Sequence, residues 1–161
     1  MTDTEPDEGR HLLLTGRPGV GKTTVVRRLV ARLTPSLRVG GFVTEEIRQE
    51  GERVGFRALV LGDGGGERVI AHREIEGAPR VASYGVNLDA VTGLAEDALD
   101  PARDADVWLV DEIGKMECLS DRFVAAVREL LEGDRPVLAT VGAGGTDFME
   151  AVRRREDAEL W

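Results

Sequence analysis

The chain has 161 residues, of which 42% are hydrophobic, so it can bury a substantial core and is expected to form a single domain over residues 1–161. Its formal net charge is −9, from 30 acidic and 21 basic residues, which argues against nucleic acid as a partner because nucleic-acid binding needs a basic face. A single cysteine excludes an internal disulfide, two histidines are too few for an ordinary Cys/His metal site, and no apolar run is long enough to span a membrane.

The acidic residues 1–9 contain no apolar stretch, so they are predicted to be a short tail rather than a signal peptide. With one unpaired cysteine, this favours a cytoplasmic protein. Lys22 and Lys115 are the only lysines, and the other 19 basic residues are arginines. This acidic, lysine-poor composition fits either a high-salt cytoplasm or GC-rich coding, and the sequence leaves both open.

The first predicted elements are a strand over 11–15, a glycine-rich loop over 16–23 and a helix over 23–33. The loop, Gly-Arg-Pro-Gly-Val-Gly-Lys-Thr, fits the phosphate-binding P-loop pattern G-x-x-x-x-G-K-[ST] in its required strand–loop–helix setting. Its backbone N–H groups can surround a phosphate, Lys22 can reach the β- and γ-phosphates, and the Thr23 hydroxyl can bind Mg²⁺. A glycine-rich turn before an ordinary helix is the alternative.

The helix over 23–33 is amphipathic, and its apolar side is expected to face a sheet. The apolar positions are Val25, Val26, Leu29, Val30 and Leu33. From 40 to 73 the pattern changes to β, and antiparallel hairpins are the economical interpretation. The expected strands there are 41–48, 53–61 and 67–71, with turns at 49–52 and 62–66.

Helices and strands alternate in the second half of the chain. The expected order is a helix over 87–99, a strand over 106–111, a helix capped by Ser120 and closed by Gly133, a strand over 135–141, a loop over 142–145 and a helix over 146–155. This alternation predicts an α/β fold with a mainly parallel sheet between helices and a β-hairpin insertion.

A P-loop enzyme needs a second carboxylate for Mg²⁺ at the end of a neighbouring buried strand. Four apolar residues, 107–110, precede Asp111, which is therefore predicted to support the metal together with Thr23. Glu112 follows at once and can polarise a water for in-line attack, so Glu112 and Lys22 are the predicted catalytic residues. The alternatives are an aspartate that only ends a strand and a solvent-exposed glutamate.

Asp111 to Gly114 also fits D-x-x-G, a switch element of GTPases. Those proteins recognise guanine with an N-K-x-D motif. Neither Lys22 nor Lys115 has that context, so guanine specificity of that type is excluded.

Five segments, taken in order, resemble the small nucleoside-triphosphatases once called cancer-related NTPases. They are 16–23, Gly-Phe-Val-Thr-Glu-Glu-Ile-Arg at 41–48, Arg-Val-Gly-Phe at 53–56, Ser-Tyr-Gly-Val-Asn at 83–87 and Asp-Glu-Ile-Gly-Lys-Met-Glu at 111–117. The P-loop is common to many families, whereas the second and fifth segments are far more specific. Members of that family normally continue through a segment containing Asn-Arg-Asp, whereas this chain ends at Trp161.

The resemblance implies a RecA-like P-loop fold and Mg²⁺-dependent hydrolysis of ATP, GTP, CTP, UTP and TTP to the diphosphate and phosphate. It also implies a set of nucleotide-binding residues. By position these are Gly16, Arg17, Pro18, Gly19, Val20, Gly21, Lys22, Thr23, Thr24, Val110, Asp111, Glu112, Ile113, Gly114 and Lys115.

Arg48 and Arg53 flank a hairpin turn, where either could act as an internal arginine finger. Cross-strand ion pairs with nearby glutamates, Glu45, Glu46 or Glu52, explain both arginines equally well.

Four other polar residues have weaker assignments. Lys115 and Glu117 could pair to orient the loop after Glu112, or could form a surface pair. His11 and His72 are expected to be ordinary strand-edge residues. Tyr84 is expected to pack in the core rather than stack on a base.

The residues as a whole predict a nucleoside-triphosphatase of broad base specificity, acting as a monomer without nucleic acid or membrane partners. A nucleotide or nucleoside kinase is the main alternative, because 40–86 occupies the place where kinases bind the acceptor. The glycine-rich stretch after Val141 is short for a kinase lid, however. A nucleotide-gated adaptor that does not turn over is the third hypothesis, and Glu112 argues against it.

Overall fold

The computed structural model describes residues 10–17, 19–62 and 64–161; the predicted tail at 1–9 and Pro18 lie outside these residues. Among the described residues the strands form one sheet in the order β5-β6-β4-β3-β2-β7-β8-β1-β9. The strands are β1 (His11–Gly16), β2 (Val39–Gln49), β3 (Glu52–Val60), β4 (Gly66–His72), β5 (Arg80–Val81), β6 (Tyr84–Val86), β7 (Val107–Ile113), β8 (Val137–Gly142) and β9 (Ala158–Leu160). The helices are α1 (Lys22–Leu33), α2 (Leu88–Ala98), α3 (Asp121–Glu132) and α4 (Asp147–Arg153), with short 3₁₀ turns η1 (Pro101–Arg103) and η2 (Glu117–Leu119).

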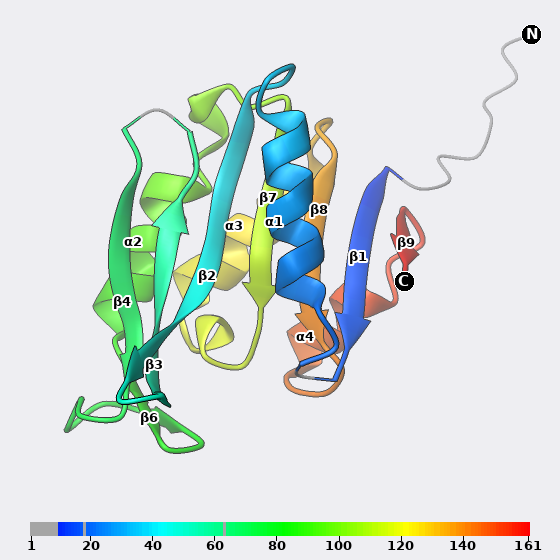
Figure 1. Ribbon diagram of the computed structural model, residues 1–161. Helices are drawn as coiled ribbons and strands as arrows, with labels where there is room; N and C mark the ends of the chain where they lie inside the picture. The colour runs from blue at the N-terminus through cyan, green and yellow to red at the C-terminus, as the bar shows by residue number, and fades with distance from the viewer. Residues whose placement is uncertain (1–9, 18, 63) are drawn as a thin grey trace, which may run out of the picture.

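One half of the sheet is parallel and the other antiparallel. Strands β2, β7, β8, β1 and β9 run parallel (Figure 1). Beyond β2 the sheet continues through β3, β4, β6 and β5, each antiparallel to the strand before it. The predicted α/β sheet with a hairpin insertion is therefore confirmed. Strand β8 lies between β1 and β7, so the P-loop strand and the strand that carries Asp111 end at the same edge, one strand apart.

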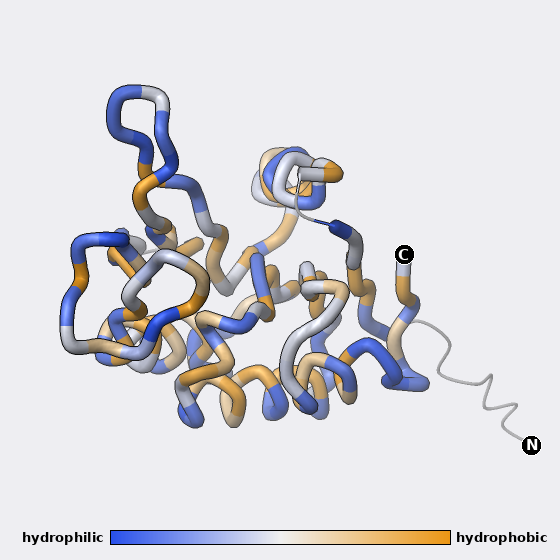
Figure 2. The backbone as a smooth tube through the Cα atoms, turned by 90° about the horizontal axis from the view of Figure 1, so that it is seen from below, coloured by the Kyte–Doolittle hydropathy of each residue, from blue (hydrophilic) through white to orange (hydrophobic). Residues whose placement is uncertain are grey.

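Helices cover both faces of the sheet (Figure 1 and Figure 2). On one face α1 packs its apolar side on the sheet in a small core that includes Val26, Val43 and Leu109. On the other face α2, α3 and α4 enclose the larger core, where the rings of Phe42 and Phe123 meet edge to face at 5.9 Å. Val25, expected on the buried side of α1, is 46% exposed, because only the narrow stripe of α1 around Val26 meets the sheet.

Helix α3 begins where its sequence predicts. The Ser120 hydroxyl accepts a hydrogen bond of 3.2 Å from the backbone N–H of Phe123, as an N-cap does. Asn87 and Thr146 cap α2 and α4 in the same way. None of the described helices is long and apolar enough to cross a membrane.

Three short strands, β5, β6 and β9, were not predicted, because two or three residues are too few for an alternating pattern to be recognised. The one with consequences is β9, which pairs in parallel with β1. The Trp161 N–H donates to the Leu13 carbonyl at 2.8 Å, and the Thr15 N–H donates to the Trp161 carbonyl at 2.9 Å. Strand β1 is therefore interior to the sheet.

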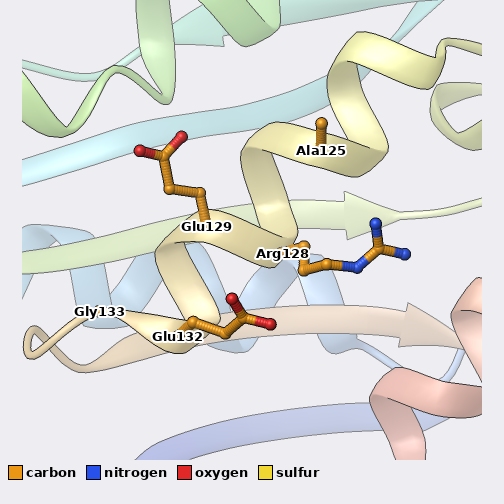
Figure 3. A pocket seen from close by; sticks show the side chains of 5 residues that line it. All are labelled: Ala125, Arg128, Glu129, Glu132 and Gly133. Atoms are coloured by element: carbon orange, nitrogen blue, oxygen red, sulfur yellow. The ribbon is translucent and has the colours of Figure 1, made fainter.

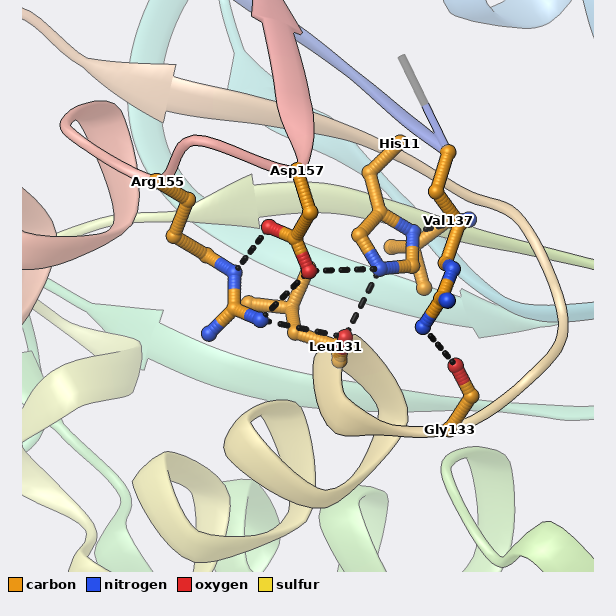
Figure 4. Close-up of polar contacts among 7 residues, drawn as sticks. His11, Leu131, Gly133, Val137, Arg155 and Asp157 are labelled. Atoms are coloured by element: carbon orange, nitrogen blue, oxygen red, sulfur yellow. Dashed lines mark hydrogen bonds and ion pairs between the residues drawn. The ribbon is translucent and has the colours of Figure 1, made fainter. Parts of the chain in front are cut away.

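The expectation that His11 is a strand-edge residue is wrong, because β9 covers the edge of β1 and leaves His11 only 1% exposed. Its Nδ1 accepts a hydrogen bond from the Val137 N–H at 3.0 Å, so Nε2 carries the hydrogen and donates to the Leu131 carbonyl at 2.7 Å (Figure 4). Asp157, held by Arg155, approaches Nε2 at 3.8 Å. This network joins β1, α3, β8 and the chain before β9.

His11 should make the fold less stable in mild acid. Burial lowers the pKa of His11 below its usual 6.5, so below that pH the unfolded chain binds a proton that the folded chain refuses. The contribution of neutral His11 to folding stability is complete above the pKa that this histidine has in the unfolded chain. It is lost as the pH falls from about 7 toward the lower pKa of His11 in the folded chain. Urea unfolding between pH 7.5 and 5.5 should show a smaller acid loss in His11→Leu than in wild type.

The pKa values of three buried carboxyl groups, those of Asp111, Glu112 and Glu117, are raised. Their protonation favours the folded state as the pH falls, which opposes the effect of His11. The contribution of His11 is therefore measured as the difference between wild type and His11→Leu. His72→Leu is the matched control and should keep the wild-type response. An identical pH response in wild type and His11→Leu would contradict the assignment.

Candidate active site

The P-loop joins β1 to α1 at the carboxyl edge of the parallel strands (Figure 1). Gly19 and Gly21 have φ of 87° and 98°, in the left-handed region that favours glycine. A β-carbon built on either residue would meet no described atom within 4 Å. The space around these two glycines is therefore open, and both lie just before the N-terminus of α1, where backbone N–H groups can bind an anion.

Lys22 opens α1, and its side chain folds back over the P-loop. Its Nζ donates a hydrogen bond of 2.6 Å to the carbonyl of Gly16, and the side chain is partly buried. The ammonium group thus lies above the loop rather than in solvent. Of the other predicted phosphate-loop residues, Arg17, Val20 and Thr24 are exposed and Thr23 is half-buried.

Asp111 lies in β7, is 2% exposed, and accepts a hydrogen bond of 2.8 Å from the Thr140 hydroxyl of β8 at Oδ1. Its second oxygen, Oδ2, is buried without a hydrogen-bond partner among the described residues. Burial raises the pKa of Asp111, while the Thr140 hydroxyl, the Thr44 backbone and the Thr23 hydroxyl act to lower it. The structure therefore brings the two predicted metal residues, Thr23 and Asp111, together.

The donor set fits a small hard cation. Mg²⁺ typically takes one or two protein oxygens and completes its shell with substrate phosphates and water. A buried carboxylate oxygen without a partner, close to a threonine hydroxyl and to an open phosphate loop, offers such a position. The described residues contain no cluster of three or more His, Cys, Asp or Glu side chains that could hold a metal by themselves.

Glu112 follows Asp111 in β7 and is half-buried. Burial raises the pKa of its carboxyl, the neighbouring charge of Asp111 raises it further, and Lys22 lowers it. The side chain is therefore in electrostatic reach of the P-loop lysine. A carboxylate with a raised pKa is a better proton acceptor than an exposed one, which suits a general base.

Thr140 contributes to this site but was not predicted from the sequence. Its hydroxyl donates to Oδ1 of Asp111, whereas Oδ2 is buried without a hydrogen-bond partner among the described residues. The available indication was one hydroxyl in the otherwise apolar run of β8, Val-Leu-Ala-Thr-Val. Alternation alone does not say which neighbouring strand that hydroxyl would face.

Glu117 does not pair with Lys115. Glu117 is 4% exposed at the start of η2, whereas Lys115 is exposed, and these two described residues form no ion pair. Burial, together with the nearby charge of Glu112, raises the pKa of Glu117 to about 8. Neither form of the predicted pair is therefore present.

Arg48 and Arg53 both bind Glu46. Arg48 Nη2 lies 2.7 Å from Glu46 Oε2, and Arg53 Nη1 lies 3.3 Å from Oε1. Arg53 also donates from Nε to the Tyr84 hydroxyl at 2.9 Å and covers the ring of Phe56. The Arg53–Glu46 pair crosses from β3 to β2 as predicted, whereas the Arg48–Glu46 pair lies within β2, so the predicted cross-strand pair is absent for Arg48.

Tyr84 is buried and meets Phe56 edge to face at 5.3 Å, so the expected core packing is confirmed. His72 is half-buried in β4 and pairs with Gly55 of β3 and Gly85 of β6, so the strand-edge expectation is wrong for His72 as well. Its Nδ1 accepts a hydrogen bond from the Glu74 N–H at 3.1 Å.

A hollow lies along α3 and contains no P-loop residue in its lining (Figure 3). It is lined by Ala125, Arg128, Glu129, Glu132 and Gly133. The three charged side chains diverge from one another in Figure 3, so they do not converge on a ligand. A neighbouring hollow beside Trp108 shares Glu129 and Gly133 with it and lies at the amino end of β7, away from Asp111.

A P-loop between β1 and α1, with Asp111 on a strand separated from β1 by β8, defines a P-loop NTPase of the RecA-like class. The chain belongs to the NTPase family, whose model matches residues 11–161.

Relatives named for an activity agree with this family. Nucleoside-triphosphatase THEP1 of Thermotoga sp. strain RQ2 is 37% identical over 93% of this chain and 84% of its own length. The cancer-related nucleoside-triphosphatase homolog of Mus musculus is 38% identical over 94% of this chain and 87% of its own length. The chain is thus an NTP-hydrolysing enzyme, and these names give the kinase alternative no support.

Two solved structures are similar over most of the chain. The crystal structure of THEP1 from Aquifex aeolicus has a TM-score of 0.82 at 35% identity, covering 93% of this chain and 87% of that one. The solution structure of a human cancer-related nucleoside triphosphatase has a TM-score of 0.78 at 35% identity, covering 95% and 88%. The predicted fold class and family are confirmed.

Proposed function

We propose that this enzyme hydrolyses ATP, GTP, CTP, UTP and TTP to the diphosphate and phosphate, with Mg²⁺ as its cofactor. The observation that carries the proposal is the buried, unpartnered Oδ2 of Asp111 beside Thr23 and the open P-loop. Burying a carboxylate oxygen without a hydrogen-bond partner costs free energy in the unliganded protein. Binding of a cation to that oxygen would offset this cost.

The phosphate groups would lie along the P-loop. The backbone N–H groups around Gly19 and Gly21 would donate to phosphate oxygens at the start of α1. Lys22 would exchange the Gly16 carbonyl for the β- and γ-phosphates, because an anionic acceptor makes a stronger hydrogen bond than a neutral carbonyl.

The metal would be held by the Thr23 hydroxyl and, directly or through water, by Asp111. When bound it would neutralise charge on the β- and γ-phosphate oxygens. Thr140 keeps the Asp111 carboxylate in one orientation by its 2.8 Å hydrogen bond to Oδ1.

Glu112 would accept the proton of the attacking water. It is the residue after the metal-supporting aspartate, and Lys22 is near enough to affect its pKa, which supports a position for its carboxylate near the γ-phosphate. Broad base specificity is proposed because aromatic residues are 4% of the chain and the single tyrosine packs in the core. The acidic composition supports a cytoplasmic monomer that binds neither nucleic acid nor membranes.

Phosphate release measured separately with the five triphosphates tests this proposal. Rates should lie within about one order of magnitude of each other, because a pocket without hydrogen bonds to the base cannot reject strongly. EDTA should abolish release, and excess Mg²⁺ should restore it. A preference for one base by several orders of magnitude would refute broad specificity, and full activity in EDTA would refute the metal assignment.

The same assay should include a nucleoside acceptor. Phosphate should still appear in solution, and no phosphorylated nucleoside should form. Formation of the nucleotide in place of phosphate would contradict the proposed reaction.

A further inference from the structure

Two carboxyl groups converge over Gly114, in the loop that follows β7. Oε1 of Glu112 and Oε2 of Glu117 each come within 2.8 Å of the position that a β-carbon on Gly114 would occupy. Glycine at this position therefore leaves space that both carboxyl groups border. The catalytic candidate Glu112 is half-buried there, and Glu117 is 4% exposed.

Among the residues that the structure describes, no lysine, arginine or histidine is a charge partner of Glu117. The charges that act on it are those of Glu112 and Asp111, both negative, and Lys115 is exposed and makes no ion pair with it among the described residues. The backbone N–H groups of Gly114 and Glu117 itself are its polar neighbours. Burial without a cationic partner disfavours the ionised form, and the pKa of Glu117 is raised to about 8.

A neutral carboxyl group has one O–H to donate, which an ionised one lacks. The carboxylate of Glu112 lies on the other side of this space and can accept a hydrogen bond. The glutamate side chain is long and flexible, so nothing in its covalent structure fixes the direction of that carboxylate. A donor next to such a side chain can restrict it to one orientation, and an O–H donor to a carboxylate makes a short, strong hydrogen bond. Catalytic groups work best when neighbouring residues hold them in this way.

We propose that Glu117 is a positioning residue, which donates its carboxyl hydrogen to Glu112 and holds that side chain over Gly114 in the orientation that activates water. This inference rests on the proposed role of Glu112 as the general base. Glu117 touches neither the nucleotide nor the metal in this scheme, and acts through Glu112 alone.

Two substitutions of Glu117 separate hydrogen-bond donation from packing and from charge. Glu117→Gln keeps a donor of similar shape, so kcat should remain at about a third of wild type or more. Glu117→Leu keeps the volume and loses the donor, so kcat should fall at least about tenfold while KM stays within about threefold. If Glu117 served only in packing, Glu117→Leu would keep the wild-type kcat. If its negative charge were required, kcat would fall in both Glu117→Leu and Glu117→Gln.

Gly114→Ala supplies an independent test without removing any polar group. Its methyl group would occupy the space between the two carboxyl groups, and the atoms displaced are the ends of flexible side chains, so the fold should survive. We expect a similar tenfold or greater fall in kcat, with a thermal midpoint close to that of wild type. Glu129→Leu, on the exposed outer face of α3, is the matched control for a glutamate-to-leucine change and should retain the wild-type kcat.

The outcomes separate this inference from the proposed function. An inactive wild type, or a Glu112→Gln variant as active as wild type, would refute the general base and this inference with it. If Glu112→Gln is inactive but Glu117→Leu has the wild-type kcat, or Glu117→Gln falls as far as Glu117→Leu, the positioning role alone is overturned. If Glu117→Leu does not fold, Gly114→Ala decides: a folded variant with lowered kcat supports the inference, and one with the wild-type kcat overturns it.

Discussion

Lys22→Ala is expected to weaken nucleotide binding and to reduce turnover by at least about 10²-fold, the usual loss when one preorganised donor to a developing charge is removed. Lys22 holds its ammonium group over the P-loop through the 2.6 Å hydrogen bond to the Gly16 carbonyl, and in the proposed function it exchanges that carbonyl for the β- and γ-phosphates. Calorimetric titration with Mg²⁺ and a non-hydrolysable triphosphate measures the binding loss, and phosphate release measures turnover.

The fold should tolerate this change, because Lys22 lies at the first turn of α1 and supports no core contact. Arg28→Ala removes one positive charge from the exposed side of the same helix and should leave binding and turnover at the wild-type level. Unchanged nucleotide affinity in Lys22→Ala would contradict the assignment of Lys22. An equal loss in Arg28→Ala would mean that the overall charge of α1, rather than the P-loop position, is responsible.

The core of the site could be predicted from sequence because its signals are local. The P-loop is one continuous octapeptide, and Asp111 and Glu112 end one continuous apolar run. Each needs only a strand that delivers it to the carboxyl edge, and the strand–helix alternation predicts parallel strands with a common edge. The structure brings Thr23 and Asp111 together accordingly.

The parts that could not be predicted depend on partners distant in sequence. His11 is buried only because β9, about 150 residues later, covers β1, and β9 is too short to show a pattern. The bond from Thr140 to Asp111 requires β8 to lie between β1 and β7, an order that no local pattern specifies.

Glu117 illustrates a further limit. A glutamate at the start of a 3₁₀ turn has no local feature that distinguishes a buried side chain from an exposed one, and glutamate is rarely fully buried without a partner. The lysine two residues earlier, Lys115, therefore suggested an ion pair. The structure places the two side chains in different environments because the loop folds Glu117 inward toward Gly114.

Glu112→Gln is expected to separate chemistry from binding. The amide keeps the size of the side chain and loses the basic carboxylate, and a general base stabilises the transition state far more than the bound substrate. Hydrolysis should therefore slow at least about a hundredfold, within the 10²–10⁴ that a general base contributes, while Mg²⁺·NTP affinity stays near that of wild type. Single-turnover phosphate release combined with equilibrium titration measures both quantities.

Asp111→Asn is the comparison that gives this prediction its specificity. Asp111 is buried with Oδ2 unpartnered beside Thr23, so its loss should raise the Mg²⁺ concentration needed for half-maximal activity, an effect that Glu112→Gln should lack. Both variants replace a carboxylate by an amide in adjacent residues of β7, so a difference between their Mg²⁺ requirements cannot come from the loss of one negative charge alone. If Glu112→Gln hydrolyses NTP at the wild-type rate while chemistry is rate-limiting, the water is activated by another group, and the pairing of Glu112 with Glu117 has no part in the reaction.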